Sequence, residues 1–303
     1  MEGFVSRPSV NNAPKKNNVT RRSGGDMEEN IKFSILIPAY NCRNLILSTV
    51  QSVMNQTYRN FEIIIIDDAS TDDTGWYVDR LRDLHRPLTK VVHRSENRGP
   101  TSSLIRGQWI ADGDVMVQVD GDGDIIEPNT LELYAKEYQD PETWLCGSML
   151  DIKTKGQRIP SPQFMFNNQC NRFGGVQQFQ PRSWRKWLWY KVPNQALRNP
   201  WTNEYWRSCS DASFLWVMWE LAGRDRVAYV WKPLYVHNHD NPLNMFKDEK
   251  MRKERDGFFD YIRSLQPYRR LESRDSEPET VPKETHFEWA HRNDLKVELD
   301  IKQ

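Results

Sequence analysis

The sequence lacks the features that mark membrane, secreted and disulfide-rich proteins. It has no apolar run close to the roughly 20 residues of a membrane-spanning helix. Its first 30 residues hold no apolar core of a secretion signal. Its four cysteines lie far apart without a Cys-x-x-Cys pair, which argues against a disulfide scaffold or a zinc ribbon. We therefore expect a soluble, cytoplasmic protein with no membrane segment.

The sequence also lacks an excess of charge of either sign. Lys and Arg together number 42, as do Asp and Glu, so the formal net charge is zero. This balance argues against a purely basic nucleic-acid binder and against an acidic solvating chain. Two glycine-rich phosphate-binding patterns, G-x-x-x-x-G-K-[ST] and G-x-G-x-x-G, are absent as well. A bound nucleotide would have to be held by other means.

A chain of 303 residues has room for one large domain or two small ones. Residues 1–30 are rich in Pro, Gly and Asn and poor in large apolar groups, so we predict a flexible tail. Residues 266–303 carry dense mixed charge and are predicted to be a solvated extension, with a short strand at 295–301 that docks back. The folded domain is expected at 31–265.

Strands and helices are predicted to alternate in the first half of this domain. Short apolar runs bounded by turn residues indicate the strands, and apolar positions three or four apart indicate the helices. The predicted strands cover 33–38, 61–66, 89–93 and 115–119, and the predicted helices cover 43–57, 74–84 and 102–111. This order implies an α/β fold with a parallel sheet and helices on both faces. Ligands of such sheets bind beyond the carboxyl ends of the strands.

Carboxylates gather where these strands end. Asp67 and Asp68 end the second strand, and Asp120, Asp122 and Asp124 follow the fourth within five residues. Three carboxylates so close together repel one another, and such a loop is favourable chiefly when it holds a cation. Hard oxygen ligands suit Mg²⁺ or Mn²⁺. A divalent ion at this edge, without a glycine-rich phosphate loop, suggests a sugar nucleotide whose diphosphate the metal neutralises.

Four motifs in this order resemble glycosyltransferase family 2. They are the run 34–41 (Ser-Ile-Leu-Ile-Pro-Ala-Tyr-Asn), the run 67–74 (Asp-Asp-Ala-Ser-Thr-Asp-Asp-Thr), the turn 97–99 (Asn-Arg-Gly) and the Asp-x-Asp at 120–122. The resemblance covers about residues 31–245. It implies an inverting enzyme of the GT-A fold, a Rossmann-like fold with a mostly parallel central sheet flanked by helices. Residues 31–130 would form the donor-binding half and 131–245 the acceptor half.

The resemblance also implies roles for single residues. Asp68 matches the Asp that hydrogen-bonds the uracil of the donor, and Asp122 matches the metal ligand, with His239 near the metal. Asp124 is the alternative ligand, because the spacing to Pro128 is one residue longer than usual. Leu104 stands where the family often has an Arg. The implied donor-binding residues are Pro38, Ala39, Tyr40, Asn41, Asp67, Asp68, Ser70, Asn97, Arg98, Asp120 and Gly121.

Asp211 is implied as the general base of the reaction. It follows Ser210 at the start of a Trp-rich helix that is predicted to end near Leu221. The alternative is that Asp211 only caps this helix, as Ser70 could cap the helix after the second strand. For the histidines His237 and His239, the alternative is an ordinary pair at a strand end.

A basic aromatic segment spans residues 152–203. It holds nine basic and nine aromatic residues and no Asp or Glu. Trp and Tyr faces stack on sugars and on bases alike, and positive charge attracts polyanions. The alternative is that the aromatic residues are mostly core and the basic residues a solvated face. The candidate acceptor-binding residues are Arg182, Trp184, Arg185, Trp187, Trp189 and Trp201.

Together these observations predict a metal-dependent inverting glycosyltransferase. It would move a sugar from a nucleoside diphosphate donor, UDP in the first place, to a hydroxyl of a glycan, with Mn²⁺ or Mg²⁺ as the cofactor. One alternative acceptor is DNA that carries hydroxymethylated bases. An alternative of another class is an inactive module that only binds a partner. The sequence does not specify the oligomeric state.

Overall fold

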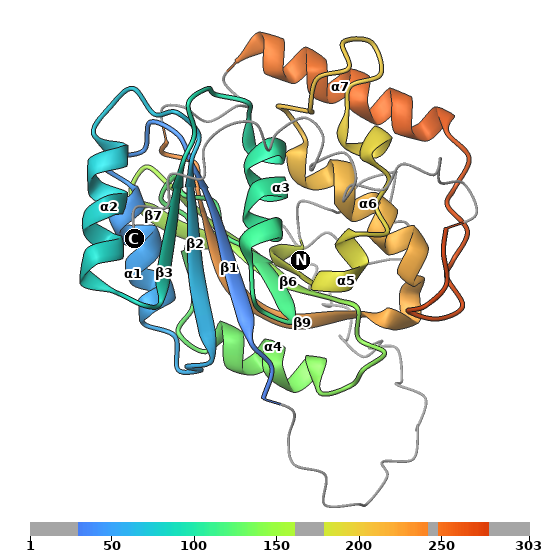
Figure 1. Ribbon diagram of the computed structural model, residues 1–303, viewed down its shortest axis with the longest axis horizontal. Coiled ribbons are helices and arrows are strands. Elements are labelled where there is room, and N and C mark those ends of the chain that lie inside the picture. The colour runs from blue at the N-terminus through green and yellow to red at the C-terminus, as the bar shows by residue number, and fades with distance from the viewer. Residues whose placement is uncertain (1–29, 161–178, 242–247, 279–303) are drawn as a thin grey trace, which may run out of the picture.

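The computed structural model describes residues 30–160, 179–241 and 248–278. The predicted tail, the predicted strand at 295–301 and part of the basic aromatic segment lie outside these ranges. A nine-stranded sheet forms the centre of the molecule, with helices on both faces (Figure 1). In the described ranges, no helix has both the length and the apolar composition needed to cross a membrane.

The part of the sheet formed by residues 31–130, called the donor half here after its predicted role, is parallel, as predicted. The strands pair in the order β3-β2-β1-β4, and each of these pairings is parallel. The connecting helices match the predicted helical patterns to within a few residues. The elements are β1 (Phe33–Ala39), α1 (Ile46–Met54), β2 (Phe61–Asp67), α2 (Thr74–Leu84), β3 (Thr89–His93), α3 (Pro100–Ile110) and β4 (Val115–Gln118).

Beyond β4 the sheet is mixed. Strand β8 (Gln180–Arg185) runs antiparallel to β4, β6 (Leu145–Thr154) antiparallel to β8, and β9 (Val227–Asn238) parallel to β6. Two short strands extend it, β5 (Ile125–Ile126) on β9 and β7 (Gln157–Pro160) on β6. The helices of this half are α4 (Thr130–Tyr138), α5 (Lys186–Trp189), α6 (Ser210–Ala222) and α7 (Glu249–Ser264), with 3₁₀ turns at Asn194–Leu197 and Arg224–Arg226.

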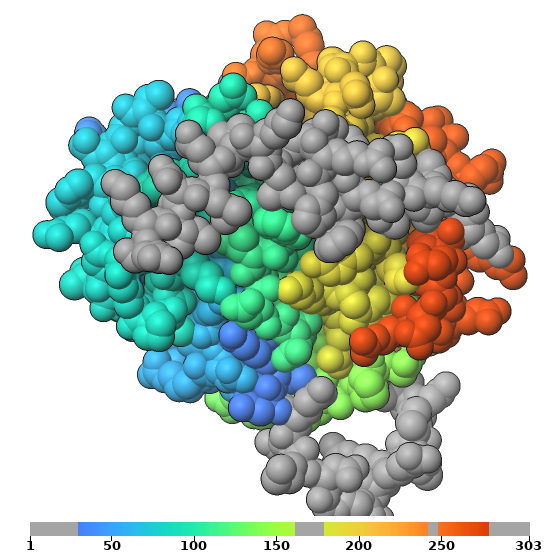
Figure 2. All heavy atoms as spheres, in the orientation of Figure 1, coloured from blue at the N-terminus to red at the C-terminus, as the bar shows by residue number. Residues whose placement is uncertain are grey.

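Alternating residues of the central strands feed two hydrophobic cores. Ile35 and Ile63 belong to the core that includes residues of α1, α2 and α4. Leu36 and Ile64 belong to the core that includes residues of α3, α5, α6 and α7. Both faces of the sheet are covered, so both sets of alternating residues are apolar. The strands therefore appear in the sequence as uninterrupted apolar runs. In the space-filling view, the two halves of the chain, blue to teal and yellow to red, meet with green segments between them (Figure 2).

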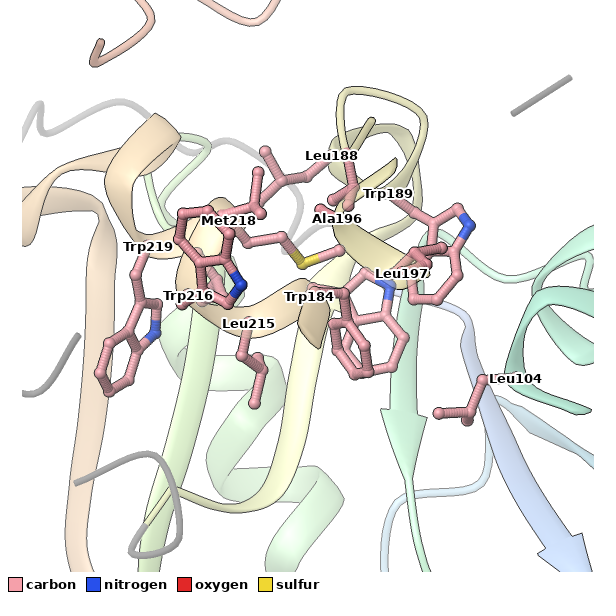
Figure 3. Packing of buried hydrophobic residues seen from close by; sticks show 14 of the residues in the cluster. Leu104, Trp184, Leu188, Trp189, Ala196, Leu197, Leu215, Trp216, Met218 and Trp219 are labelled. Atoms are coloured by element: carbon pink, nitrogen blue, oxygen red, sulfur yellow. The ribbon is translucent and has the colours of Figure 1, made fainter. Parts of the chain in front are cut away.

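The second core contains six buried tryptophans among the described residues. The rings of Trp184 and Trp189 stack with centroids 5.8 Å apart (Figure 3). Each of the two rings lies 5.0 Å from that of Phe214 in α6. Both Trp side chains are fully buried, at 0% and 1% exposure. The prediction that they bind an acceptor is therefore wrong, because a buried ring has no free face to stack on a ligand. For these two residues the core interpretation is confirmed.

The charged stretch after α7 is anchored to the domain at Leu271, while nine of its thirteen described residues, 266–278, are exposed, as expected of a solvated segment. Leu271 is 3% exposed, and its backbone N–H donates to the carbonyl of Leu221 at 2.9 Å. Arg226 donates to the carbonyls of Leu271 and Glu272, each at 2.7 Å. Its guanidinium lies 4.0 Å from the ring centroid of Trp144. One buried leucine and one buried arginine thus hold down a segment whose average composition is polar.

We predict that this docking contributes to the stability of the whole domain. Leu271→Ala should lower the free energy of unfolding by about 2 kcal/mol, because it removes a buried side chain. The matched control is Leu84→Ala, whose side chain is 77% exposed and should cost less than about 0.5 kcal/mol. Denaturant unfolding measures both. Equal losses in the two variants would contradict the docking.

Candidate active site

The turn after β3 binds both carboxylate oxygens of Asp68. The backbone N–H of Arg98 donates to Oδ1 at 3.2 Å, and that of Gly99 donates to Oδ2 at 2.7 Å. Arg94 approaches the same carboxylate, with Nε 3.5 Å from Oδ1. Burial raises the pKa of Asp68 above its usual value. In this structure Asp68 therefore shapes the turn 97–99, and its predicted contact with a base stays a prediction.

The loop after β1 is tied to the loop after β2. Asn41 has a positive φ of 48°, its N–H donates to Oγ of Ser70 at 3.0 Å, and its Oδ1 accepts from the N–H of Thr71 at 2.8 Å. Tyr40 is 44% exposed. Two residues predicted from the first motif and one from the second therefore lie together at this edge of the sheet.

Pro38, Ala39 and Gly121 lie at this edge through their backbones. The N–H of Gly121 donates to the carbonyl of Pro38 at 3.1 Å, and the N–H of Asp68 donates to the carbonyl of Ala39 at 2.9 Å. A Cβ on Gly121 would lie 2.6 Å from the Pro38 oxygen, closer than real atoms approach. The glycine is needed here because it lets the loop after β4 run against β1.

Asp122 carries the least satisfied carboxylate of the acidic cluster. Its Oδ2 accepts from Nδ2 of Asn241 at 2.8 Å, while its Oδ1 is buried and has no hydrogen-bond partner among the described residues. Burial, Asp124 and Asp120 together raise the pKa of Asp122 to about 7. A buried carboxylate oxygen that has no partner and is surrounded by negative charge is energetically unfavourable, and a bound cation removes this cost. The residues present therefore fit a divalent ion at Asp122.

Asp124 is fully buried and hydrogen-bonded on both oxygens. It accepts from the hydroxyl of Tyr235 at 2.7 Å and from the N–H of Asn238 at 2.7 Å, and Nδ1 of His237 lies 2.8 Å away. Burial opposes a charged His237, but Asp124 and then Asp122 raise its pKa to about 9. Because these contacts occupy Asp124, the structure does not favour it as the alternative metal ligand.

The structure places His237 against the acidic cluster, and the predicted position of His239 near a metal stays a prediction. His239 donates its backbone N–H to the carbonyl of Lys153 at 2.9 Å, and its ring lies 4.8 Å from that of His237. Within the described residues, no group of three or more His, Cys, Asp or Glu side chains is arranged to hold a metal ion. The described residues would thus supply only part of the coordination of a bound ion.

Arg182 joins Asp211 of the acceptor half to Asp120 of the donor half. Its Nη2 forms an ion pair with Oδ2 of Asp211, and its Nη1 lies 3.9 Å from Oδ2 of Asp120. Asp211 lies in the first turn of α6, but the residue at the N-cap position is Cys209, and no side chain caps the helix. The alternative that Asp211 is a helix cap is therefore wrong. The sequence predicts that Arg182 binds an acceptor, but its guanidinium interacts with these two carboxylates.

The remaining acceptor candidates divide into buried and exposed residues. Arg185 is 9% exposed and donates to the backbone carbonyls of Thr143 at 3.0 Å and Tyr138 at 2.8 Å. Its predicted role in acceptor binding is wrong, because its guanidinium is buried and donates to backbone carbonyls. Trp187 is half-buried, with its ring 4.7 Å from that of Trp144. Of the tryptophans proposed for the acceptor, Trp201 is the exposed one, at 68%.

Sequence analysis missed two arginines at the edge of the sheet formed by the loops after β1, β2 and β3, which we call the donor edge. Arg207 donates to Oδ1 of Asn97 at 2.7 Å and to its carbonyl at 3.0 Å. Arg94 immediately follows β3 and contacts Asp68, whereas Leu104, where the family often has an Arg, is fully buried. The position of Arg94 at a strand end was a usable signal. No local pattern could have linked Arg207 to Asn97, 110 positions earlier.

Comparison with known families decides which group of proteins the chain joins. The model of glycosyl transferase family 2 matches residues 34–205, more than half of the chain. This chain belongs to glycosyltransferase family 2. The match covers all the motifs of the donor half and ends shortly before α6.

Individual relatives match over shorter stretches. The glycosyltransferase GlyG of Streptococcus pneumoniae is 30% identical over 110 residues, which are 36% of each chain. The chain therefore matches about a third of this relative's length. S. aureus TarS in complex with UDP has a TM-score of 0.54 at 22% identity, over 69% of this chain and 60% of TarS. A mannosyltransferase of Pyrobaculum calidifontis, solved with GDP-mannose and Mn²⁺, has a TM-score of 0.52 at 17% identity, over 78% and 66%.

These structural likenesses show the fold. The chain has the GT-A fold, with a Rossmann-like donor half followed by the mixed part of the sheet. Both identities are too low to transfer a substrate.

We predict that His93 makes the stability of the donor edge depend on pH. Its Nδ1 lies 3.0 Å from Asp67 and its Nε2 3.0 Å from Asp79, which Arg82 also contacts at 2.8 Å. The hydrogen bond with Asp67 and that with Asp79 raise the pKa of His93 to about 9, against about 6.5 in an unfolded chain. The stabilisation is thus complete below about pH 6.5 and is lost as the pH rises through about 9.

Thermal unfolding between pH 6 and pH 10 measures this effect. The midpoint Tm of the wild type should fall more steeply over this range than that of His93→Gln, which keeps a polar side chain but cannot titrate. Parallel curves for the two proteins would show that the charge of His93 contributes nothing.

Proposed function

We propose that this chain is an inverting glycosyltransferase that moves a sugar from a nucleoside diphosphate to a hydroxyl of a glycan. The observation that carries the proposal is the juxtaposition of Asp120 and Asp211 on one buried arginine, Arg182. It places a carboxylate of the donor half beside a carboxylate of the acceptor half. A transferase needs both at the point where the two substrates meet.

The proposed donor site is the edge formed by the loops after β1, β2 and β3. Asp68 and the turn 97–99 would hold the nucleobase, while Tyr40 has an exposed ring that can pack on it. Uridine is the first choice because of the sequence resemblance, and TarS has been solved with UDP and UDP-GlcNAc. Guanosine is the second, since the Pyrobaculum neighbour was solved with GDP-mannose.

Asp122 is the proposed ligand of Mn²⁺ or Mg²⁺, with His237 or His239 beside it. The support is the unpartnered buried oxygen of Asp122 and the negative charge of Asp120 and Asp124 around it. When bound, such an ion neutralises charge on the departing diphosphate. Since the described residues offer few ligands, oxygens of the donor would complete the coordination.

Asp211 is proposed to act as the general base. It accepts the proton of the acceptor hydroxyl while the oxygen forms a bond to the anomeric carbon of the donor sugar. The bond from this carbon to the diphosphate breaks on the opposite face, and the nucleoside diphosphate leaves with the bonding electrons. One attack from the far side inverts the configuration, and the proton ends on Asp211.

A glycan acceptor is favoured over DNA. The argument for DNA depended on aromatic faces for a flipped base, and Trp184 and Trp189 are buried. Trp201 keeps an exposed ring that can stack on a sugar. An inactive binding module is not favoured either, because such a module has no need for Asp211 and Asp122 at one site.

We predict that the purified chain hydrolyses one nucleotide sugar slowly without an acceptor. The measurement is release of nucleoside diphosphate from a panel of UDP-sugars and GDP-mannose, with Mn²⁺ and with EDTA. Release from one donor that EDTA abolishes would support the proposed reaction class and the metal, and it would identify the nucleobase of the donor. Release that persists in EDTA would contradict the role of the metal.

We also predict that Asp211→Asn lowers the kcat of sugar transfer by about 10²- to 10⁴-fold, the usual range for loss of a general base. Binding of the donor, measured by calorimetry, should change by less than about threefold, because Asp211 acts on the acceptor. The control is Asp260→Asn, a carboxylate on α7 that is 80% exposed and should leave kcat unchanged. Unchanged kcat in Asp211→Asn would exclude it as the base.

A further inference from the structure

We propose that Arg182 is a positioning residue for Asp211, rather than an acceptor-binding residue. The inference rests on the proposed role of Asp211 as base. Arg182 holds one oxygen of this carboxylate and thereby directs the other toward the acceptor hydroxyl.

The topology of the sheet places Arg182 at the junction of the two halves. Strand β8 pairs antiparallel with β4, and the register sets Arg182 opposite Gln118. Gln118 in turn donates from Nε2 to Oδ1 of Asp120 at 2.8 Å. Arg182 thus lies one strand away from the start of the acidic cluster, where the carboxylate of Asp211 meets it.

The guanidinium of Arg182 is enclosed by protein. Its side chain is 5% exposed and contacts Asp211 and Asp120. With the amide oxygen of Gln180 turned toward it, Gln180 accepts from Nη1 at 3.0 Å and from Nη2 at 2.6 Å. A residue that bound the acceptor would need exposed N–H groups, and Arg182 has hardly any surface for this.

The charges explain why this position needs an arginine. Asp120 and Asp211 are like charges near each other, since both approach the guanidinium of Arg182. Removal of a buried cation from between two carboxylates leaves uncompensated charge. The rigid, planar fork of arginine contacts two acceptors at fixed angles, which a lysine cannot do.

The ion pair occupies Asp211 on one side only. Arg182 contacts Oδ2, and Oδ1 of Asp211 accepts no hydrogen bond from the described residues. Nε of Arg182 is itself buried without a partner among these residues. The two carboxylates and Gln180 therefore set the orientation of the guanidinium, and this orientation leaves the Nε–H donor without an acceptor among the described residues. The result is a carboxylate with one fixed oxygen and one free oxygen, as a positioned base requires.

A double-mutant cycle in kcat tests the inference. Arg182→Met should lower the kcat of transfer about 100-fold, with the KM for the donor within about threefold, because the base loses its orientation. In the Asp211→Asn background, the same change should alter kcat by less than about threefold, since no base is left to position. Arg182→Lys should restore part of the loss. Losses that multiply in the double variant would overturn the inference.

A second result would also overturn it. If Arg182→Met raises the KM for the acceptor and leaves kcat at saturating acceptor unchanged, Arg182 binds the acceptor. The matched control is Arg226→Lys, another buried arginine, which lies against Trp144 and should lower Tm without changing kcat. If Arg182→Met fails to fold, Arg182→Lys carries the same cycle.

Failure of the proposed function has a different signature. A wild type that releases no nucleoside diphosphate from any donor contradicts the proposed reaction itself. The same four proteins then test the ion pair by thermal unfolding. Losses of Tm that add up independently would contradict the ion pair on which the inference depends, whereas a double variant no less stable than the Arg182 variant would support that ion pair.

Discussion

Repulsion among carboxylates at the end of β4 is the constraint around which this half of the molecule is arranged. Asp124 is hydrogen-bonded to Tyr235, His237 and the backbone of Asn238. Asp120 and Asp211 share Arg182. Asp122 alone keeps a buried oxygen without a partner among the described residues. The protein thus neutralises its own cluster except at one position, and that position is where an external cation is most favourable.

The groups that answer these charges come from strands that are distant in sequence. Tyr235 and His237 belong to β9 and Arg182 belongs to β8, whereas the aspartates follow β4. The antiparallel pairing of β8 with β4 is the step that brings the two sets together. The mixed part of the sheet therefore does more than extend the core. It carries the counter-charges without which the acidic loop after β4 would be unfavourable.

This division explains how much of the structure the sequence could predict. The parallel donor half follows from local patterns, and Asp68 and Asp122 lie at the expected strand ends. The roles of Arg182 and His237 depend on pairings across more than 60 and 110 positions, which no periodicity reveals. Composition also failed to separate function from core, because Trp184 has the same aromatic character buried under α6 as it would have on a sugar platform. Only the burial of each ring distinguishes the two.

The start of α6 shows how the donor edge and the proposed base are mechanically joined. Cys209, which precedes the helix, has a positive φ of 58°, a conformation that costs free energy in a residue other than glycine. Its neighbours hold it there: the N–H groups of Arg207 and Ser208 donate to Glu254 of α7, and the Arg207 side chain grips Asn97. The turn that binds Asp68 and the helix that carries Asp211 are thus fixed to each other through one arginine. The left-handed conformation of Cys209 is therefore maintained by contacts of the preceding residues with α7 and with the turn 97–99.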